Sequence, residues 1–160
     1  GTWTQIGQDI DGEAADDRFG RAVALSSDSS VVAIGATWND ANGNNSGHVR
    51  LYRNVSDTWT QIGDDIDGEA ADDWSGYAVA LSTDGSVVAI GARYNDGNGV
   101  NSGHVRMYRN EGGTWTQISQ GINGEAAHDQ SGSSVALSAD GSVVAIGAKD
   151  NDGNGKTGRN

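Results

Sequence analysis

Short apolar segments with the alternation of β-strands recur along the chain, and none has a helical period over an adequate length. In the first copy, Val23 and Leu25 alternate with small alanines, which predicts a half-buried strand. The segment VVAIGA is apolar at every position, as expected of a strand that packs on both faces. The expected strands of the first copy cover residues 22–26, 31–36 and 48–53, with residues 2–6 as a more exposed outer strand.

The same pattern returns at intervals of 56 residues. The segments SSDSSVVAIGA, STDGSVVAIGA and SADGSVVAIGA begin at Ser26, Ser82 and Ser138. A fixed period of this length indicates copies of one supersecondary unit. Each unit is expected to be a four-stranded antiparallel sheet with two apolar faces, which neighbouring sheets must cover. Sheets stacked face to face around an axis form a β-propeller, so we predict an all-β fold of propeller-type blades.

The number of units predicts an incomplete propeller. We interpret residues 1–160 as one repeat domain with about three repeats. A closed propeller needs about four to eight blades, and an open sheet edge is a template for pairing with another chain. We therefore expect further repeats or several copies to assemble. The expected units are residues 1–18 (a closing outer strand and loop), 19–74, 75–130 and 131–160 (a truncated blade).

Composition and charge limit the partners. Twenty-five glycines and no proline favour many tight turns. A formal net charge of −12 disfavours nucleic acid and anionic membranes and favours cations, calcium included. The sequence contains no stretch of 18 apolar residues, so we expect no membrane insertion. The absence of cysteine excludes disulfides, thiolate catalysis and cysteine-based zinc sites.

The segment FGRAVALSSDSSVVAIGA, which begins at Phe19, resembles the FG-GAP repeat, the blade unit of integrin α-subunit propellers and of many surface proteins. The resemblance covers the whole chain and implies propeller blades, an extracellular or cell-surface location and a role in structure or cell adhesion. It also implies calcium bound by an Asp-x-Asp-x-Asp-Gly loop between the first two strands. Here that loop keeps one carboxylate per unit, which we interpret as a turn former: Asp28, Asp84 and Asp140.

The acidic loops that follow the outer strand are the first candidate binding sites. They read DIDGEAADD twice and GINGEAAHD in the last copy. Their carboxylates are candidate calcium ligands. The alternative is a turn-rich connection whose carboxylates accept backbone hydrogen bonds. The candidate ligands are Asp9, Asp11, Glu13 and Asp17 in the first loop and Asp65, Asp67, Glu69 and Asp73 in the second.

The loops rich in Asn, Asp and Gly form a second candidate site. In the last copy, Asp150, Asp152 and Asn154 alternate as in an oxygen-rich calcium loop, and a flexible turn is the alternative. The first two copies replace Asp150 with Trp38 and Tyr94. These rings are candidate ligand-binding residues, because an aromatic ring can stack on a sugar.

Catalysis is not expected. His48 and His104 lie two residues before an arginine, without a nucleophile at a recognisable spacing, and we interpret them as strand residues that pair with acidic loops. A glycan-active enzyme stays an alternative, because its paired carboxylates need only spatial proximity. An enzyme, however, usually breaks repeat symmetry at its site, whereas almost every acidic residue repeats.

We therefore predict a non-catalytic, extracellular structural or adhesive repeat module. Its expected partners are other copies or further repeats of the same protein, or an extracellular protein or glycan, and calcium is the one cofactor considered. A carbohydrate-binding, lectin-like propeller is the first alternative. Asn44 and Asn54 begin Asn-x-Ser sequons and would make the chain a glycoprotein in a eukaryotic source.

Overall fold

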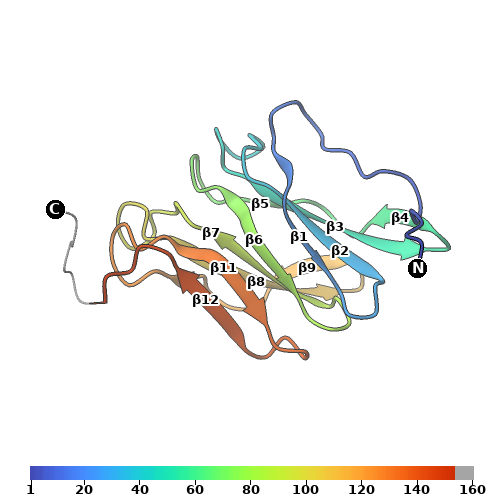
Figure 1. Cartoon of the computed structure of the whole chain (residues 1–160). Coiled ribbons are helices and arrows are strands. Elements are labelled where there is room, and N and C mark those ends of the chain that lie inside the picture. Colours follow the sequence, from blue (N-terminus) through green and yellow to red (C-terminus); the bar gives the residue numbers. More distant parts are fainter. Residues whose placement is uncertain (154–160) are drawn as a thin grey trace.

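The computed structural model describes residues 1–153, which form three consecutive antiparallel sheets (Figure 1). The first blade contains β1 (Phe19–Leu25), β2 (Val31–Ala36), β3 (His48–Val55), β4 (Thr58–Gln61) and β5 (Ile66–Asp67). The second contains β6 (Ser75–Leu81), β7 (Val87–Ala92), β8 (His104–Glu111), β9 (Thr114–Gln117) and β10 (Ile122–Asn123). The third blade contains β11 (Ser131–Leu137) and β12 (Val144–Ala148).

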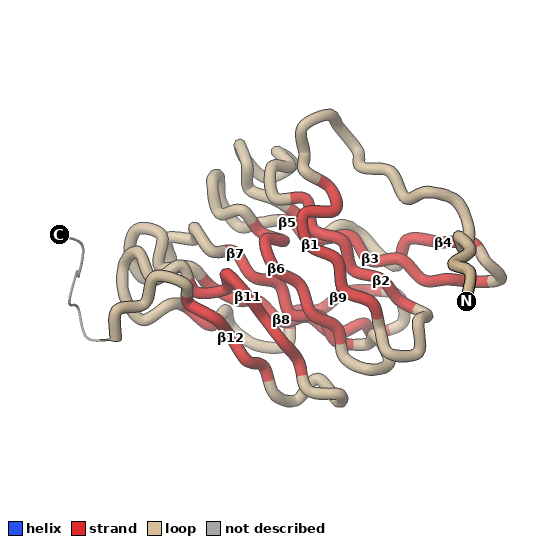
Figure 2. The backbone as a smooth tube through the Cα atoms, in the orientation of Figure 1, coloured by secondary structure: helices blue, strands red, loops and turns tan. Residues whose placement is uncertain are grey.

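Strands and loops account for all of the described residues (Figure 2), so no helix among them could cross a membrane. In the first blade the strand order is β1-β2-β3-β4, and β5 also pairs with β3. The outer strand of the blade is therefore made in two pieces, β4 and β5. The predicted all-β fold of four-stranded antiparallel blades is confirmed, and over residues 1–153 the sheets do not close into a ring.

The second strands of the first two blades, β2 and β7, contribute buried residues to the hydrophobic cores between the blades. Every residue of β2 and β7 is buried, as predicted for VVAIGA. One core lies between the first and second blades and includes Val31, Leu51 and Ile90. Another lies between the second and third blades and includes Val87 and Met107. These cores stack the blades in chain order. On the other face of the first blade, Ile10, Phe19 and Trp59 cover the buried β2 residues.

The segment before β1 differs from the prediction. Residues 2–6 form no strand, although their copies form β4 and β9, and Trp3 is fully exposed. The copies pair with β3 and β8 of their own blades, whereas residues 2–6 have no equivalent strand beside them. The segment nevertheless follows the outer-strand path. Trp59 donates its indole N–H to the Ile6 carbonyl at 3.2 Å, as Trp115 does to the Ile62 carbonyl at 2.9 Å.

Candidate functional site

The acidic loops lie between the loops of consecutive blades. In the acidic loop at residues 65–73, the backbone carbonyls of Gly68 and Glu69 accept hydrogen bonds from the Asn42 amide at 2.8 and 3.1 Å. On the other side, Asp73 accepts a hydrogen bond from Asn95 at 2.9 Å. The blade before the acidic loop and the blade after it therefore both hold the loop through asparagine side chains.

A hydrogen-bonded aspartate-asparagine pair with a buried aspartate recurs in every unit. Asn39 donates to Asp17 at 2.9 Å, Asn95 to Asp73 at 2.9 Å and Asn151 to Asp129 at 3.1 Å. All three aspartates are buried. Burial raises the pKa of Asp73, while hydrogen bonds from Asn95 and from the Ala70 N–H oppose that rise. These recurring carboxylates hold two loops together, and their binding of calcium stays a prediction.

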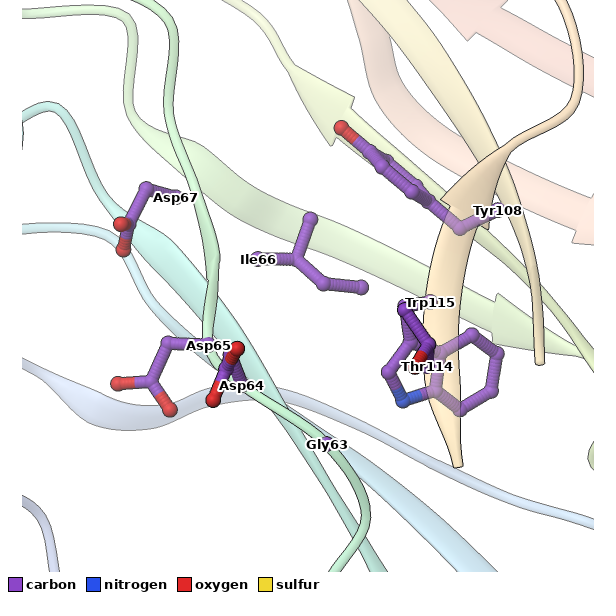
Figure 3. A pocket seen from close by; sticks show the side chains of 8 residues that line it. All are labelled: Gly63, Asp64, Asp65, Ile66, Asp67, Tyr108, Thr114 and Trp115. Atoms are coloured by element: carbon purple, nitrogen blue, oxygen red, sulfur yellow. The ribbon is translucent and has the colours of Figure 1, made fainter. Parts of the chain in front are cut away.

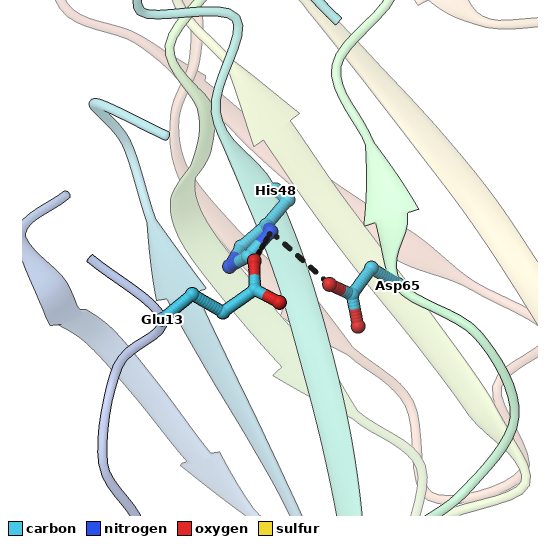
Figure 4. Close-up of side chains that lie close together, drawn as sticks. All are labelled: Glu13, His48 and Asp65. Atoms are coloured by element: carbon cyan, nitrogen blue, oxygen red, sulfur yellow. Dashed lines mark ion pairs between the residues drawn. The ribbon is translucent and has the colours of Figure 1, made fainter. Parts of the chain in front are cut away.

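A histidine and two carboxylates meet at the start of β3 (Figure 4), and an arginine of the same strand contacts both carboxylates. Glu13 comes from the segment before β1, and Asp65 from the loop before β5. The His48 side chain is 0% exposed, and its Nδ1 lies 3.5 Å from Asp65 Oδ2 and 3.9 Å from Glu13 Oε2. Neither ring nitrogen has a hydrogen-bond partner. Burial lowers the pKa of His48, and the charges of Asp65, Asp67 and Asp17 oppose that shift.

Arg50 holds the two carboxylates beside His48. Its guanidinium contacts the Glu13 carboxylate, and its Nε lies 3.0 Å from Asp65 Oδ2. Gln61 donates a further hydrogen bond to Asp65 Oδ1 at 2.6 Å. Because His48 and Arg50 are two residues apart on one strand, they point to the same side of the sheet. The interpretation of the histidines as strand residues beside acidic loops agrees with this cluster, but the sequence did not distinguish Glu13 and Asp65 from the other loop carboxylates.

The second blade repeats this cluster without one carboxylate. His104 Nδ1 lies 3.5 Å from Glu69, and the Arg106 guanidinium lies 3.9 Å from the same carboxylate. The position equivalent to Asp65 is Gly121. Burial also lowers the pKa of His104, while Glu69 and a hydrogen bond with Asn123 act in the opposite direction. Repeat symmetry is therefore broken at this position.

A pocket lies between the first and second blades (Figure 3). Its volume is about 240 Å³. Asp64, Asp65 and Asp67 lie on one side of Ile66, and the aromatic rings lie on the other. Burial raises the pKa of Tyr108, which lines the pocket. The aromatic lining residues, Tyr108 and Trp115, were not among the predicted site residues.

The carboxylate between the first two strands forms a turn in every unit, as predicted. Asp84 Oδ1 accepts hydrogen bonds from the Ser82 hydroxyl, the Ser86 hydroxyl and the Ser86 N–H at 2.8 to 3.0 Å. Asp28 and Asp140 have the same three bonds. Hydrogen bonds to the ionised form lower the pKa of Asp84 and of Asp140 to about 2.

The two rings that are candidates for stacking on a sugar both pack on Trp74. Trp38 and Trp74 have ring centroids 6.0 Å apart, and Trp74 and Tyr94 have centroids 4.7 Å apart, both edge to face. The Arg18 guanidinium lies over the Trp38 ring at 3.1 Å. Sugar binding by Trp38 and Tyr94 stays a prediction, and both rings already have protein partners.

The same two positions are in contact in all three units. One is the residue just before the first strand of the blade, and the other lies two residues after the end of its second strand. In the first unit the contact is a cation-π interaction between Arg18 and Trp38. It is an edge-to-face ring contact between Trp74 and Tyr94 in the second. In the third it is a hydrogen bond from Gln130 to Asp150 at 2.5 Å. The contact is kept while its chemistry changes.

The other predicted residues are spread over the surface. Asp9 accepts a hydrogen bond from Gln5 at 2.9 Å, and Asp11 lines a shallow hollow beside Glu13. Asp152 is exposed, and the predicted ligand Asn154 lies outside the described residues. The sequon residue Asn44 is exposed. Asn54 is half-buried and accepts a hydrogen bond from the Asp57 N–H at 3.0 Å.

Comparison with known families identifies both complete blades. A model of the FG-GAP repeat matches residues 10–52 and again residues 66–108, which together make up more than half of the chain. Each match begins in or beside an acidic loop and runs into the third strand of its blade. No curated protein matches the chain.

Proposed function

The chain belongs to the FG-GAP repeat family, and we propose that it is a non-catalytic structural or adhesive module of an extracellular or cell-surface protein. FG-GAP repeats are typical of extracellular or surface proteins, and the family is generally non-catalytic. We further propose that the module acts by stacking on other FG-GAP units, including those of a second copy.

Two exposed apolar side chains on β1, at the edge of the first blade, carry this proposal. In the second blade, Val79 and Leu81 pack into the core shared with the first blade. The equivalent residues of the first blade, Val23 and Leu25, are 63% and 56% exposed. The two pairs have the same positions and residue types. Their difference in exposure therefore arises because the second blade has a blade packed on this face and the first blade does not. Because the two side chains are already partly covered, covering the rest would stabilise a complex by about 1 kcal/mol each.

The third blade presents the complementary face. Val31 and Ala33 of the first blade are buried against the second, and Val87 and Ala89 are buried in the same way against the third. Their equivalent Val143 is 63% exposed, and Ala145 is also exposed. The β12 strand of one copy can therefore meet the first blade of another as β2 meets the second blade within one chain. Such head-to-tail contact is heterologous and extends into rings or filaments.

The acidic residues support a structural role over a catalytic one. The aspartates that recur in all units, Asp17, Asp73 and Asp129, are each bonded to an asparagine of the following loop. An extracellular location would fit the exposed sequon residue Asn44. The adhesive partner, whether protein or glycan, would be recognised by the loops that differ between units.

Sedimentation velocity over a range of protein concentrations tests the stacking. We expect species heavier than the 16.5 kDa chain. Because each chain carries a formal charge of −12, added salt should strengthen the association by screening repulsion. Leu25→Lys should abolish the heavier species. Val55→Lys, at a position 57% exposed on the β3–β4 hairpin, is the matched control and should leave them unchanged. A monomer at all concentrations would disprove stacking between copies.

A further inference from the structure

We propose that Glu13, His48 and Asp65 form a binding site for a divalent transition-metal ion, with Zn²⁺ as the best fit. One ligand atom from each residue lies within 4.8 Å of the others. The three residues come from the segment before β1, from β3 and from the loop before β5 (Figure 4). A bound ion would therefore fasten the first segment of the chain to the first blade.

Two of the three ligand distances are close to those of tetrahedral zinc, and the third, between the Glu13 and Asp65 oxygens, is within 4.8 Å. Zinc binds nitrogen and oxygen ligands at about 2.0–2.2 Å, which places neighbouring tetrahedral ligands about 3.3–3.5 Å apart. His48 Nδ1 and Asp65 Oδ2 are 3.5 Å apart, and His48 Nδ1 and Glu13 Oε2 are 3.9 Å apart. The Glu13 side chain is 42% exposed, so it can move by a few tenths of an ångström. That exposed side also gives the ion a path from solvent and leaves room for a water as fourth ligand.

The unpartnered imidazole is the observation that points to an ion. His48 is completely buried, and neither of its ring nitrogens has a hydrogen-bond partner. A buried polar atom without a partner costs free energy, and a metal ion on Nδ1 would remove that cost for one nitrogen. Imidazole suits zinc, copper and nickel, whereas calcium prefers oxygen ligands. The histidine therefore distinguishes this site from the calcium sites predicted for the acidic loops.

Arg50 fits the role of an outer-shell residue. It contacts Glu13 Oε1 and leaves Oε2 turned toward His48. Its Nε also donates a hydrogen bond to Asp65 Oδ2 at 3.0 Å, so a bound ion would share this oxygen with Arg50. Carboxylate ligands of metal sites are usually held by such second interactions. The positive guanidinium weakens cation binding. The negative charges of Asp17 and Asp67, which also act on His48, oppose that effect.

The second blade supplies an internal control. Glu69, His104 and Arg106 repeat the cluster, but Gly121 stands where the first blade has Asp65. A Cβ on Gly121 would lie 3.3 Å from His104 Nδ1, so a side chain at this position would point at the histidine. We therefore assign one transition-metal site to the natural chain, in the first blade.

Isothermal titration with ZnCl₂ and absorption spectra with Co²⁺ test the assignment on the full chain. The natural chain should bind one Zn²⁺ and give the intense visible bands of tetrahedral cobalt. Asp65→Gly, which copies the residue found in the second blade, should weaken zinc binding at least tenfold. Circular dichroism without metal would show that this variant is folded. Gly121→Asp should bind a second equivalent, a gain that misfolding cannot produce.

The assignment would be overturned by no saturable zinc binding by the folded natural chain, or by unchanged affinity in Asp65→Gly. Equal affinity for Ca²⁺ and Zn²⁺, with no effect of His48→Gln, would also overturn it, because the imidazole would then not be a ligand. Zinc affinity measured at a concentration where the chain is monomeric separates this test from that of blade stacking.

Discussion

Gly35 of β2 faces Gly76 of β6 so closely that a Cβ built on Gly35 would lie 2.1 Å from the Gly76 carbonyl oxygen. Gly91 and Gly132 repeat the relationship between the second and third blades at 2.2 Å. The φ angles of Gly76 and Gly132, +81° and +83°, lie in the region that favours glycine. One glycine of VVAIGA and the glycine that opens the next blade therefore form a single contact.

Gly35→Ala should destabilise the chain. The added methyl group meets backbone, which cannot rotate away, so we expect a loss of about 2–3 kcal/mol in the free energy of unfolding. Urea denaturation measures it. Gly147→Ala is the matched control, because the equivalent Cβ meets only the Ser134 hydroxyl, which can rotate. Equal losses in the two variants would contradict a role for contact between blades.

Loss of the buried Asp73 carboxylate should be costly. Asp73→Ala leaves the Asn95 amide and the Ala70 N–H without their acceptor. We expect a loss of about 2–3 kcal/mol in the free energy of unfolding, measured by urea denaturation. Asp73→Asn keeps an acceptor oxygen and should lose less. Similar losses for the two variants would show that the charge, and not the hydrogen bonding, is what the loop requires.

Chelation tests calcium in the acidic loops separately. If these carboxylates act only through hydrogen bonds such as Asn95 to Asp73, EGTA should leave the melting temperature of the chain unchanged. EGTA is added to protein already stripped of zinc, so that the His48 site does not contribute. A lower melting temperature that Ca²⁺ restores would return calcium to the acidic loops.

The turn carboxylates should make stability depend on pH at the acid end. The pKa of Asp84 is lowered from 3.8 to about 2, chiefly by the Ser86 N–H and the Ser82 hydroxyl. A lowered pKa adds stability above pH 3.8 that is lost as the pH falls through about 2. The stability difference between the natural chain and Asp84→Asn should therefore shrink over that range.

Because Asp84 is exposed, we expect the difference at neutral pH to stay below about 1 kcal/mol. Chemical denaturation at pH 7, 4 and 2 measures it. Asp57→Asn, another exposed aspartate in a turn, is the control. A difference that does not vary with pH would show that the hydrogen bonds to Asp84 do not require its charge.

The aromatic contacts should matter for stability. Trp38→Ala removes the ring that contacts Arg18 and Trp74, and we expect a loss of about 1–2 kcal/mol in the free energy of unfolding. If the Trp38 ring acts only in packing, any glycan that binds the natural chain on an array should also bind the folded Trp38→Ala variant. A specific glycan that binds the natural chain and Val100→Ala, but not Trp38→Ala, would favour the lectin-like alternative instead.

Alternation and periodicity predicted the sheets well because these signals are local. The buried strand β2 lies exactly where VVAIGA stands. Residues 2–6 carry the same TWTQI pattern as β4 and β9, yet form no strand. A strand needs a neighbouring strand to pair with its backbone groups. The sequence of the segment alone does not show whether such a neighbour is present.

The candidate site was less predictable because it joins residues far apart in the chain. The sequence singled out Glu13, Asp65 and His48, but in two separate groups. Their meeting depends on how the segment before β1 lies along the first blade, which no local pattern reports. Comparing the units column by column does show that Gly121 replaces Asp65, and this difference was the available signal.

The contact that is made in turn by Arg18 with Trp38, Trp74 with Tyr94 and Gln130 with Asp150 constrains how such repeats diverge. Since the two positions always touch, a change at one alters the demands on the other. In an alignment of many FG-GAP units, the residue types at these two positions should covary. We expect a cation with an aromatic ring, two aromatic rings, or an amide with a carboxylate. The two residues would thus change together. Transferring one of them alone from one unit to another should destabilise the unit, whereas transferring both should not.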